Sequence, residues 1–227
     1  TRAVDLGAAA RALVAPLGPI ARDPISAIGA SDPRILSAYD ATSQSVPFSA
    51  REVAEIAYDH PSATVHAGLR ATTDVVRKSF DAEGVVHFAG HTRLPSDRDA
   101  RGGSLGGRWV TADGEIGVRE LRTTAMRARL AVLSTCTPEP EMDERRVTSV
   151  RAGVPAFAYA LHAVGVPNVV SATTEVRDVP AAVLMKRFHR AAQHRDVARA
   201  LRDAQQLVRR FHPHPAWWAP FVVSVGG

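Results

Sequence analysis

The chain has 227 residues, of which 45% are hydrophobic and 22% are charged, and its formal net charge is +5. This length suits one domain, and this composition excludes a disordered tail, a collagen-like rod and a disulfide-rich scaffold. The single cysteine, Cys136, excludes an intrachain disulfide, so we expect a reducing, cytoplasmic compartment.

Short β-rich runs alternate with segments of helical periodicity, which is typical of an α/β layer structure. In chain order, the predicted strands cover residues 24–30, 84–90, 129–134, 167–172 and 220–225. The predicted helices cover residues 49–59, 72–80, 148–164, 178–192 and 196–211. Because the strand segments are almost continuously apolar, we expect a mostly parallel sheet with helices on both faces.

Sequence signals mark two helix starts and one apolar helix face. Ser49 and Glu52 have the spacing of a capping box, in which side chains bind free backbone N–H groups. Asp178 can cap the helix that starts there. The predicted apolar stripe of the last helix consists of Val197, Leu201, Ala204, Val208 and Phe211.

The distribution of charge argues against a membrane or nucleic-acid partner. Residues 152–174 carry no charge, but glycines and prolines interrupt them, so we interpret them as a buried helix and strand. Residues 183–211 hold eight cations and two acids, which suits either a nucleic-acid-binding surface or a solvated helix face. We favour the solvated face because aromatic residues do not alternate with the arginines as stacking platforms would.

Neither a cofactor nor a metal ion is expected. The sequence contains no GxGxxG motif and no GxxxxGK motif followed by Ser or Thr, the two common nucleotide fingerprints. His87 and His91 are four residues apart, but on a strand this spacing spans about 13 Å, too far for two ligands of one ion. We interpret His87 as a core histidine and His212 and His214 as structural.

Cys136 and His91 follow directly on two of the predicted strands. Ligands of an open parallel sheet bind outside the carboxyl ends of its strands, so both side chains are expected at one functional edge. A thiol is mostly protonated at neutral pH, and a nearby histidine can take its proton and activate it as a nucleophile. A lone cysteine at a strand end also suits a small buried hydrophobic residue, and this alternative stays open.

Two sequence blocks, VVHFAGH (85–91) and AVLSTCT (131–137), resemble the catalytic blocks of the CHAT peptidases. These are caspase-like cysteine peptidases of the caspase and separase class. Further blocks resemble the family in the same order, at residues 49–57, 153–178, 184–192, 200–210 and 214–223. The resemblance implies a caspase-like three-layer sandwich over residues 24–227. The Ala-rich sequence before it instead predicts an N-terminal helical segment, residues 1–23, that can dock on another domain.

The resemblance also assigns catalytic roles. It implies that Cys136 is the nucleophile and His91 the general base of a cysteine endopeptidase. Backbone N–H groups of Gly90, Thr92 and Cys136 would then stabilise the oxyanion of the tetrahedral intermediate.

The resemblance further implies the substrate class and the regulation. Asp178, together with Glu175, would face a basic side chain of a protein or peptide substrate, which would be cut after Arg or Lys. A sensor or repeat region in the same or a partner chain would regulate the activity, and bacterial relatives are associated with defence and cell death. Residues 92–114 and 137–149 are the segments expected to become ordered on activation.

The sequence departs from the family pattern in four places, which include residues 137–146, the N-terminal part and two single positions. Thr92 stands where glycine is usual, and a residue near Thr174 stands where tryptophan is usual. These departures keep a second hypothesis open: a catalytically inactive caspase-like module that binds a protein partner.

Overall fold

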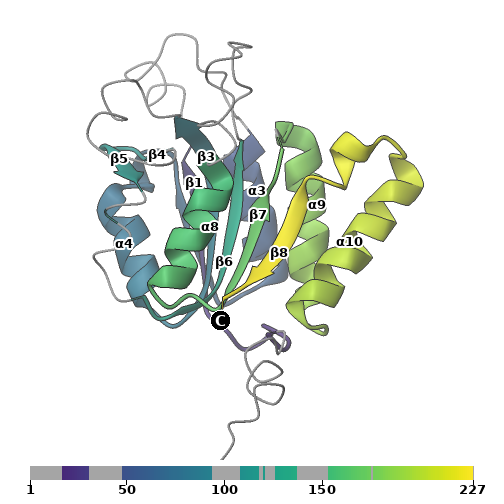
Figure 1. The fold of residues 1–227 in the computed structure, drawn as a ribbon, viewed down its shortest axis with the longest axis horizontal. Coiled ribbons are helices and arrows are strands. Elements are labelled where there is room, and N and C mark those ends of the chain that lie inside the picture. The colour runs from purple at the N-terminus through teal and green to yellow at the C-terminus, as the bar shows by residue number, and fades with distance from the viewer. Residues whose placement is uncertain are drawn as a thin grey trace, which may run out of the picture.

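The computed structural model describes residues 17–30, 48–93, 108–117, 120, 126–136, 153–174 and 176–226, with residues 136 and 153–156 described by their backbone. These residues form an eight-stranded sheet with five α-helices around it (Figure 1). The strands are β1 (Ile25–Ala30), β2 (Ala63–Ala67), β3 (Gly84–Arg93), β4 (Arg108–Val110), β5 (Glu115–Gly117), β6 (Ala128–Cys136), β7 (Asn168–Ala172) and β8 (Phe221–Val225). The α-helices are α3 (Phe48–Asp59), α4 (Thr73–Asp81), α8 (Gly153–Ala163), α9 (Asp178–Ala192) and α10 (Val197–Phe211).

The sheet is mostly parallel. Its strand order is β2-β1-β3-β6-β7-β8, and among these strands β8 alone pairs in the antiparallel sense. The hairpin of β4 and β5 extends the sheet at the carboxyl end of β3, where Thr92 pairs with Trp109. The central strands are buried on both faces, which explains their continuous apolar sequences.

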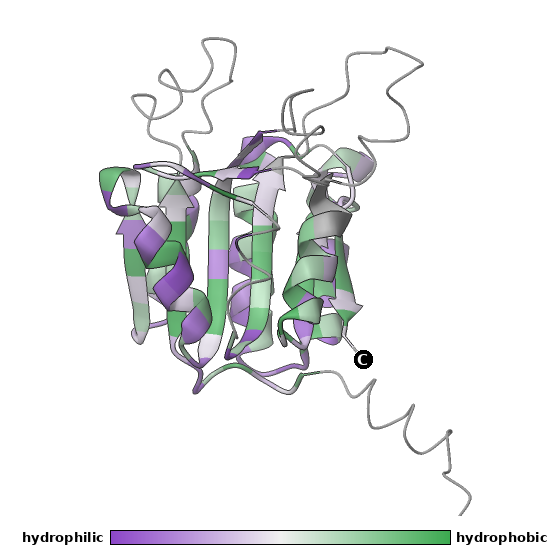
Figure 2. Cartoon of the chain, turned by 60° about the vertical axis from the view of Figure 1, so that its left-hand side comes forward, coloured by the Kyte–Doolittle hydropathy of each residue, from purple (hydrophilic) through white to green (hydrophobic). Residues whose placement is uncertain are grey.

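Helices cover both faces of the sheet, so the predicted three-layer α/β sandwich is confirmed. Helices α3, α9 and α10 pack on one face, in a core that includes Val53, Leu130 and Leu184. Helices α4 and α8 pack on the other face, in a core that includes Phe80 and Phe157. Figure 2 shows mainly hydrophobic strands between helices that carry both hydrophilic and hydrophobic residues.

The structure confirms the predicted strands and helices, with small changes at their ends, as far as they lie in the described residues. Residues 148–152 of one predicted helix lie outside them, and that helix begins at Gly153. The uncharged run contains α8, a turn at Gly165 with φ of 106°, and β7. No helix in the described ranges is long and apolar enough to cross a membrane. The short strands β2, β4 and β5 were not predicted.

The predicted capping box at the start of α3 is wrong. The helix begins at Phe48, so Ser49 lies in its first turn, buried together with Glu52. The Glu52 carboxylate accepts a hydrogen bond from His87 on β3, at 2.8 Å, instead of binding its own helix start. The reason is that Glu52 lies on the helix face that packs against the sheet, beside Val53 and Ile56.

The prediction that Asp178 caps its own helix is also wrong. The N-cap of α9 is Arg177, without a side-chain cap, and Asp178 is the first helical residue. Its Oδ2 atom accepts a hydrogen bond from the backbone N–H of Phe48, at 2.9 Å, so this carboxylate binds a free N–H group at the start of α3. A negative side chain there is favourable because a helix N-terminus carries partial positive charge.

The terminal parts of the chain give one more correction. Of the stripe predicted for α10, Phe211 at the helix end is 73% exposed, whereas the other four residues are buried. At the other end, residues 1–16 of the predicted N-terminal segment lie outside the described residues. Leu17 and Ile20, from its last part, are buried in the core that contains α3 and α9.

Candidate active site

His91 and Cys136 are register partners at the carboxyl ends of two adjacent parallel strands, β3 and β6. The pairing is continuous from Val85 with Leu130 to His91 with Cys136, so the alignment does not depend on a single contact. Adjacent strands lie about 4.8 Å apart, so the two backbones are direct neighbours across the sheet. The sequence prediction that both residues lie at one edge of one sheet therefore agrees with the strand register.

The backbone beside His91 is closely packed. A Cβ atom at Gly90 would lie 2.9 Å from the carbonyl oxygen of Ala30 and 3.2 Å from the Phe88 ring, so only glycine fits there. Thr92 is fully buried and continues the extended strand. No non-glycine residue in the described part of the chain has a positive φ, so Thr92 replaces glycine without backbone strain.

A small pocket opens at the same edge of the sheet, between the strand ends and the amino-terminal turns of α3 and α9. The residues that line it are Ser49, Glu52, Ala89, Gly90, Ser134, Thr135, Val176, Asp178 and Ala181. Gly90 and Thr135 directly precede His91 and Cys136, so the pocket adjoins the histidine and cysteine positions. Of the two predicted substrate-binding acids, Asp178 lines the pocket and Glu175 lies outside the described residues.

Asp178 is held in a partly desolvated position. Burial raises the pKa of its carboxyl group above the ordinary value, and the charge of Glu52 raises it further. The hydrogen bond from the Phe48 N–H opposes both effects. The two acids therefore repel each other within one pocket.

A chain of buried histidines lies behind Glu52. His87 bonds Glu52 through Nε2, and its Nδ1 lies 3.0 Å from Nε2 of His189 on α9. His60 directly follows the end of α3, and its Nε2 atom lies 3.2 Å from the carbonyl oxygen of His189. Burial holds the pKa of His189 well below its ordinary value, and the neighbouring His87 and His60 add to this effect. The interpretation of His87 as a hydrogen-bonded core histidine is confirmed.

Sequence reasoning did not identify the partners in this network. The signal was present in α3, where Ser49, Glu52, Val53 and Ile56 recur at the three- and four-residue spacing of one helix face. Two polar residues on an otherwise apolar face require buried hydrogen-bond partners. His189 lies likewise on the buried face of α9, beside Met185.

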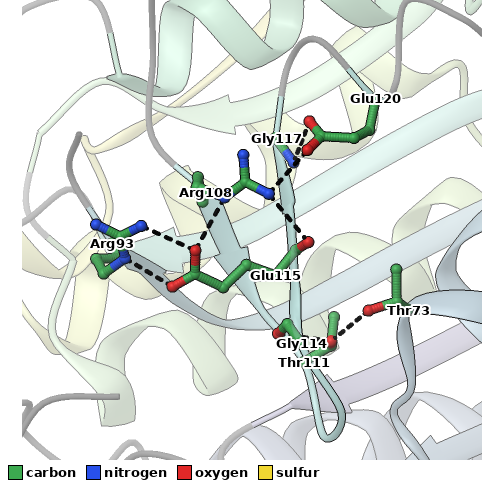
Figure 3. Close-up of polar contacts among 8 residues, drawn as sticks. All are labelled: Thr73, Arg93, Arg108, Thr111, Gly114, Glu115, Gly117 and Glu120. Atoms are coloured by element: carbon green, nitrogen blue, oxygen red, sulfur yellow. Dashed lines mark hydrogen bonds and ion pairs between the residues drawn. The ribbon is translucent and has the colours of Figure 1, made fainter. Parts of the chain in front are cut away.

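An ion-pair cluster fixes the end of β3 two residues after His91 (Figure 3). Arg93 binds both carboxylate oxygens of Glu115, at 2.6 and 2.9 Å. Arg108 bridges Glu115, at 2.9 Å, and Glu120, at 2.8 Å. The other Glu120 oxygen accepts the Gly117 N–H at 3.1 Å. This clamp, formed by Arg93, Arg108, Glu115 and Glu120, joins the strand that carries His91 to the β4–β5 hairpin.

The turn of the hairpin is fixed to α4. The hydroxyl groups of Thr73 and Thr111 lie 2.8 Å apart, and Thr111 also donates to the carbonyl oxygen of Gly114 (Figure 3). Asp113 accepts the backbone N–H of Thr73 at 2.7 Å, in the first turn of α4. The hairpin therefore has anchors on β3 and on α4.

The other histidines named from the sequence have packing roles. His212 stacks on Trp217 with ring centroids 3.8 Å apart, and Nδ1 of His214 accepts the N–H of Ala216. Within the described residues, no group of three or more His, Cys, Asp or Glu residues has an arrangement that suits a metal ion.

Comparisons with known proteins identify relatives of the fold. A family model described as CHAT domain matches residues 6–226. A comparison with curated proteins returns no match. The Arg-specific cysteine proteinase gingipain R (RgpB) matches with a TM-score of 0.51 and 9% identity, over 93% of this chain and 49% of that chain.

Two further solved structures agree with this result. The complex of the pro- and mature domains of RgpB from Porphyromonas gingivalis matches with a TM-score of 0.54 and 8% identity, over 96% of this chain and 51% of that one. A protein from Geobacter sulfurreducens matches with a TM-score of 0.52 and 14% identity, over 93% of this chain and 94% of that one. The chain thus spans about half the length of the gingipain chains, and at these identities the similarity establishes a common fold.

Proposed function

Because the chain belongs to the CHAT domain family and has the caspase-like fold of a cysteine proteinase, we propose that it is a cysteine endopeptidase. The observation that carries the proposal is the register pairing of His91 with Cys136 at the carboxyl edge of the sheet. In this proposal the peptidase domain comprises residues 24–227, and residues 1–23 form an N-terminal segment.

The proposed reaction proceeds through an acyl-enzyme. His91 takes the thiol proton of Cys136, and the thiolate forms a bond to the carbonyl carbon of the scissile peptide. The backbone N–H groups of Gly90, Thr92 and Cys136 stabilise the negative oxygen that develops. His91 then gives its proton to the leaving amine, and water hydrolyses the thioester.

The pocket beside this pair supports specificity for a basic residue. Asp178 brings a carboxylate into the pocket, where it can form a charge-assisted hydrogen bond with a guanidinium or ammonium group. Glu175, three residues earlier in the chain, contributes a second negative charge in this proposal. A protein or peptide cut after Arg or Lys is therefore the proposed substrate, with a sensor or repeat region as the regulator.

A peptide-library cleavage profile tests the proposed activity, run on this chain alone and within its full natural polypeptide. We expect cleavage after Arg or Lys, and at least a thousandfold lower kcat/KM in Cys136→Ala and His91→Ala, because each substitution removes one member of the pair. Unchanged cleavage by Cys136→Ala contradicts the proposal. A folded wild-type protein without cleavage in both contexts supports the inactive binding module.

A further inference from the structure

Among the described residues that line the pocket, two carry carboxylates and none is a cation that could balance them. Glu52 has a side chain that is 2% exposed, and its carboxylate accepts a hydrogen bond from Nε2 of His87. Asp178 has the Phe48 N–H as its hydrogen-bond partner. No Lys or Arg in the described part of the chain pairs with either acid. Two uncompensated acids in a partly desolvated pocket attract a cation strongly, since low-dielectric surroundings strengthen the interaction between charges.

An unpaired hydroxyl group lies in the same pocket. Ser134 is 8% exposed, lines the pocket, and its Oγ atom has no hydrogen-bond partner. It is the register partner of Ala89, which also lines the pocket. Buried polar groups without partners are uncommon in folded proteins, and an unpaired hydroxyl in a pocket is therefore a free acceptor for a ligand.

The histidines behind Glu52 hold its carboxyl group in place. The only arrangement that avoids a buried N–H without an acceptor has His189 donating from Nε2 to Nδ1 of His87, and His87 donating from Nε2 to Glu52. Nδ1 of His189 then carries no proton, which agrees with its lack of a hydrogen-bond partner. Both rings are neutral in this arrangement, so the histidines orient Glu52 without neutralising it.

We propose that Glu52 is a further specificity-determining residue, which binds the guanidinium group of an arginine side chain together with Asp178 and Ser134. This inference rests on the proposed peptidase function and names the deep end of its substrate pocket. Guanidinium suits the pocket better than ammonium because it is planar and presents five N–H donors in fixed directions, to acceptors on three separate elements. These elements are α3 for Glu52, β6 for Ser134 and α9 for Asp178.

Glu52→Gln is the informative variant. The glutamine carbonyl can still accept the His87 hydrogen, so the substitution removes the charge and leaves the histidine network its acceptor. Glu55→Gln is the matched control, since Glu55 lies on the same helix and pairs with Lys186 and Arg51. Ser134→Ala provides a second test, because it removes an unpaired hydroxyl and deprives no other group of a hydrogen-bond partner.

Calorimetric titration with N-acetyl-arginine methylamide and its citrulline analogue measures binding without requiring catalysis. We expect the wild-type protein and Glu55→Gln to bind the arginine compound at least tenfold more tightly than the citrulline compound, which has the same shape and no charge. Glu52→Gln should lose at least tenfold in affinity for the arginine compound alone, and Ser134→Ala about threefold. Equal affinity for the arginine compound in Glu52→Gln and wild type overturns the inference. If Glu52→Gln fails to fold, the affinity of Ser134→Ala for the arginine compound is compared with that of the wild type, and equal values overturn the inference.

Peptide cleavage separates this inference from the proposed function. The ratio of kcat/KM for Arg over Lys peptides should fall in Glu52→Gln and stay constant in Glu55→Gln. If the protein cleaves no peptide but its binding of arginine depends on Glu52, the peptidase proposal is refuted and the arginine-binding role of Glu52 is supported. Cleavage after Arg with an unchanged ratio in Glu52→Gln would support the peptidase and refute the role of Glu52.

Discussion

His189 shows how a single buried side chain links the site to the stability of the protein. It is fully buried on α9, and it meets His87 of β3 and His60 after α3 with ring centroids 5.0 and 5.9 Å apart. Among the residues that the structure describes, no carboxylate bonds it directly, because Glu52 lies on the far side of the His87 ring. Its neutral form is therefore the one that the folded protein accommodates.

Stability is expected to fall as the pH falls below about 6.5, the ordinary pKa of histidine. The pKa of His189 is lowered in the folded state. At pH values between this folded-state pKa and 6.5, the histidine therefore binds a proton in the unfolded chain and stays neutral in the folded protein. Each such group lowers the free energy of unfolding by up to about 1.4 kcal/mol per pH unit. The lowered pKa of His60, caused first by burial, acts in the same direction.

Urea denaturation at pH 7.5, 6 and 5 checks this prediction. His189→Gln should lose less free energy of unfolding between pH 6 and pH 5 than the wild type, by about 1 kcal/mol. The exposed His194→Gln serves as the control and should keep the wild-type slope. Parallel pH profiles for His189→Gln and wild type would contradict the assignment of a neutral His189.

At the scale of elements, the clamp joins β3 to the β4–β5 hairpin through one partly buried carboxylate. Hydrogen bonds from Arg93 lower the pKa of Glu115 most, burial opposes them, and the charges of Arg93 and Arg108 add to the lowering. A lowered pKa means that the stabilisation is complete above about 4.5 and is lost as the pH falls through the folded-state pKa below it.

Glu115→Gln is expected to cost about 1–3 kcal/mol of unfolding free energy at pH 7, because it leaves two arginines without their shared carboxylate. The cost should shrink below pH 4.5, where the wild-type carboxylate is also being protonated. Glu83→Gln is the control, since its ion pair with Arg127 is exposed on both sides and should cost less than about 0.5 kcal/mol. Equal costs for the two variants in urea denaturation would show that the clamp does not stabilise the hairpin.

The same elements show what the sequence could predict. Strands β1, β3, β6 and β7 were predictable because burial on both faces gives each of them a continuous apolar run. Strand β2 was not, because it lies at the sheet edge with no fully buried residue, and β4 and β5 were not, because three residues carry too little pattern.

The side-chain partners of the site were less predictable than the strands. The spacing of Ser49 and Glu52 fits a capping box as well as it fits a buried helix face, and only the packing of α3 on β3 distinguishes the two. Asp178 has the same ambiguity, because its partner, the Phe48 N–H, lies 130 positions away in the sequence. Pairing across such distances depends on the tertiary fold, which local patterns do not contain.

At the scale of the whole molecule, the candidate site assembles where four elements converge at the carboxyl edge of the sheet. Strands β3 and β6 bring His91 and Cys136 together, and the amino-terminal parts of α3 and α9 bring Glu52 and Asp178 beside them. The exposed arginines of α9 and α10 lie on solvent-facing positions of those helices, away from the buried stripe, as the solvated-face interpretation requires.

The pairing of Cys136 with His91 can be tested without any substrate. Because the chain has one cysteine, the rate of alkylation by iodoacetamide across pH 5 to 10 reports on that thiol alone. The wild-type protein should react with an apparent pKa clearly below 8.5, the ordinary thiol value, and His91→Ala should return the profile to about 8.5. Superimposable profiles near 8.5 for the two proteins would show that the histidine does not activate the cysteine.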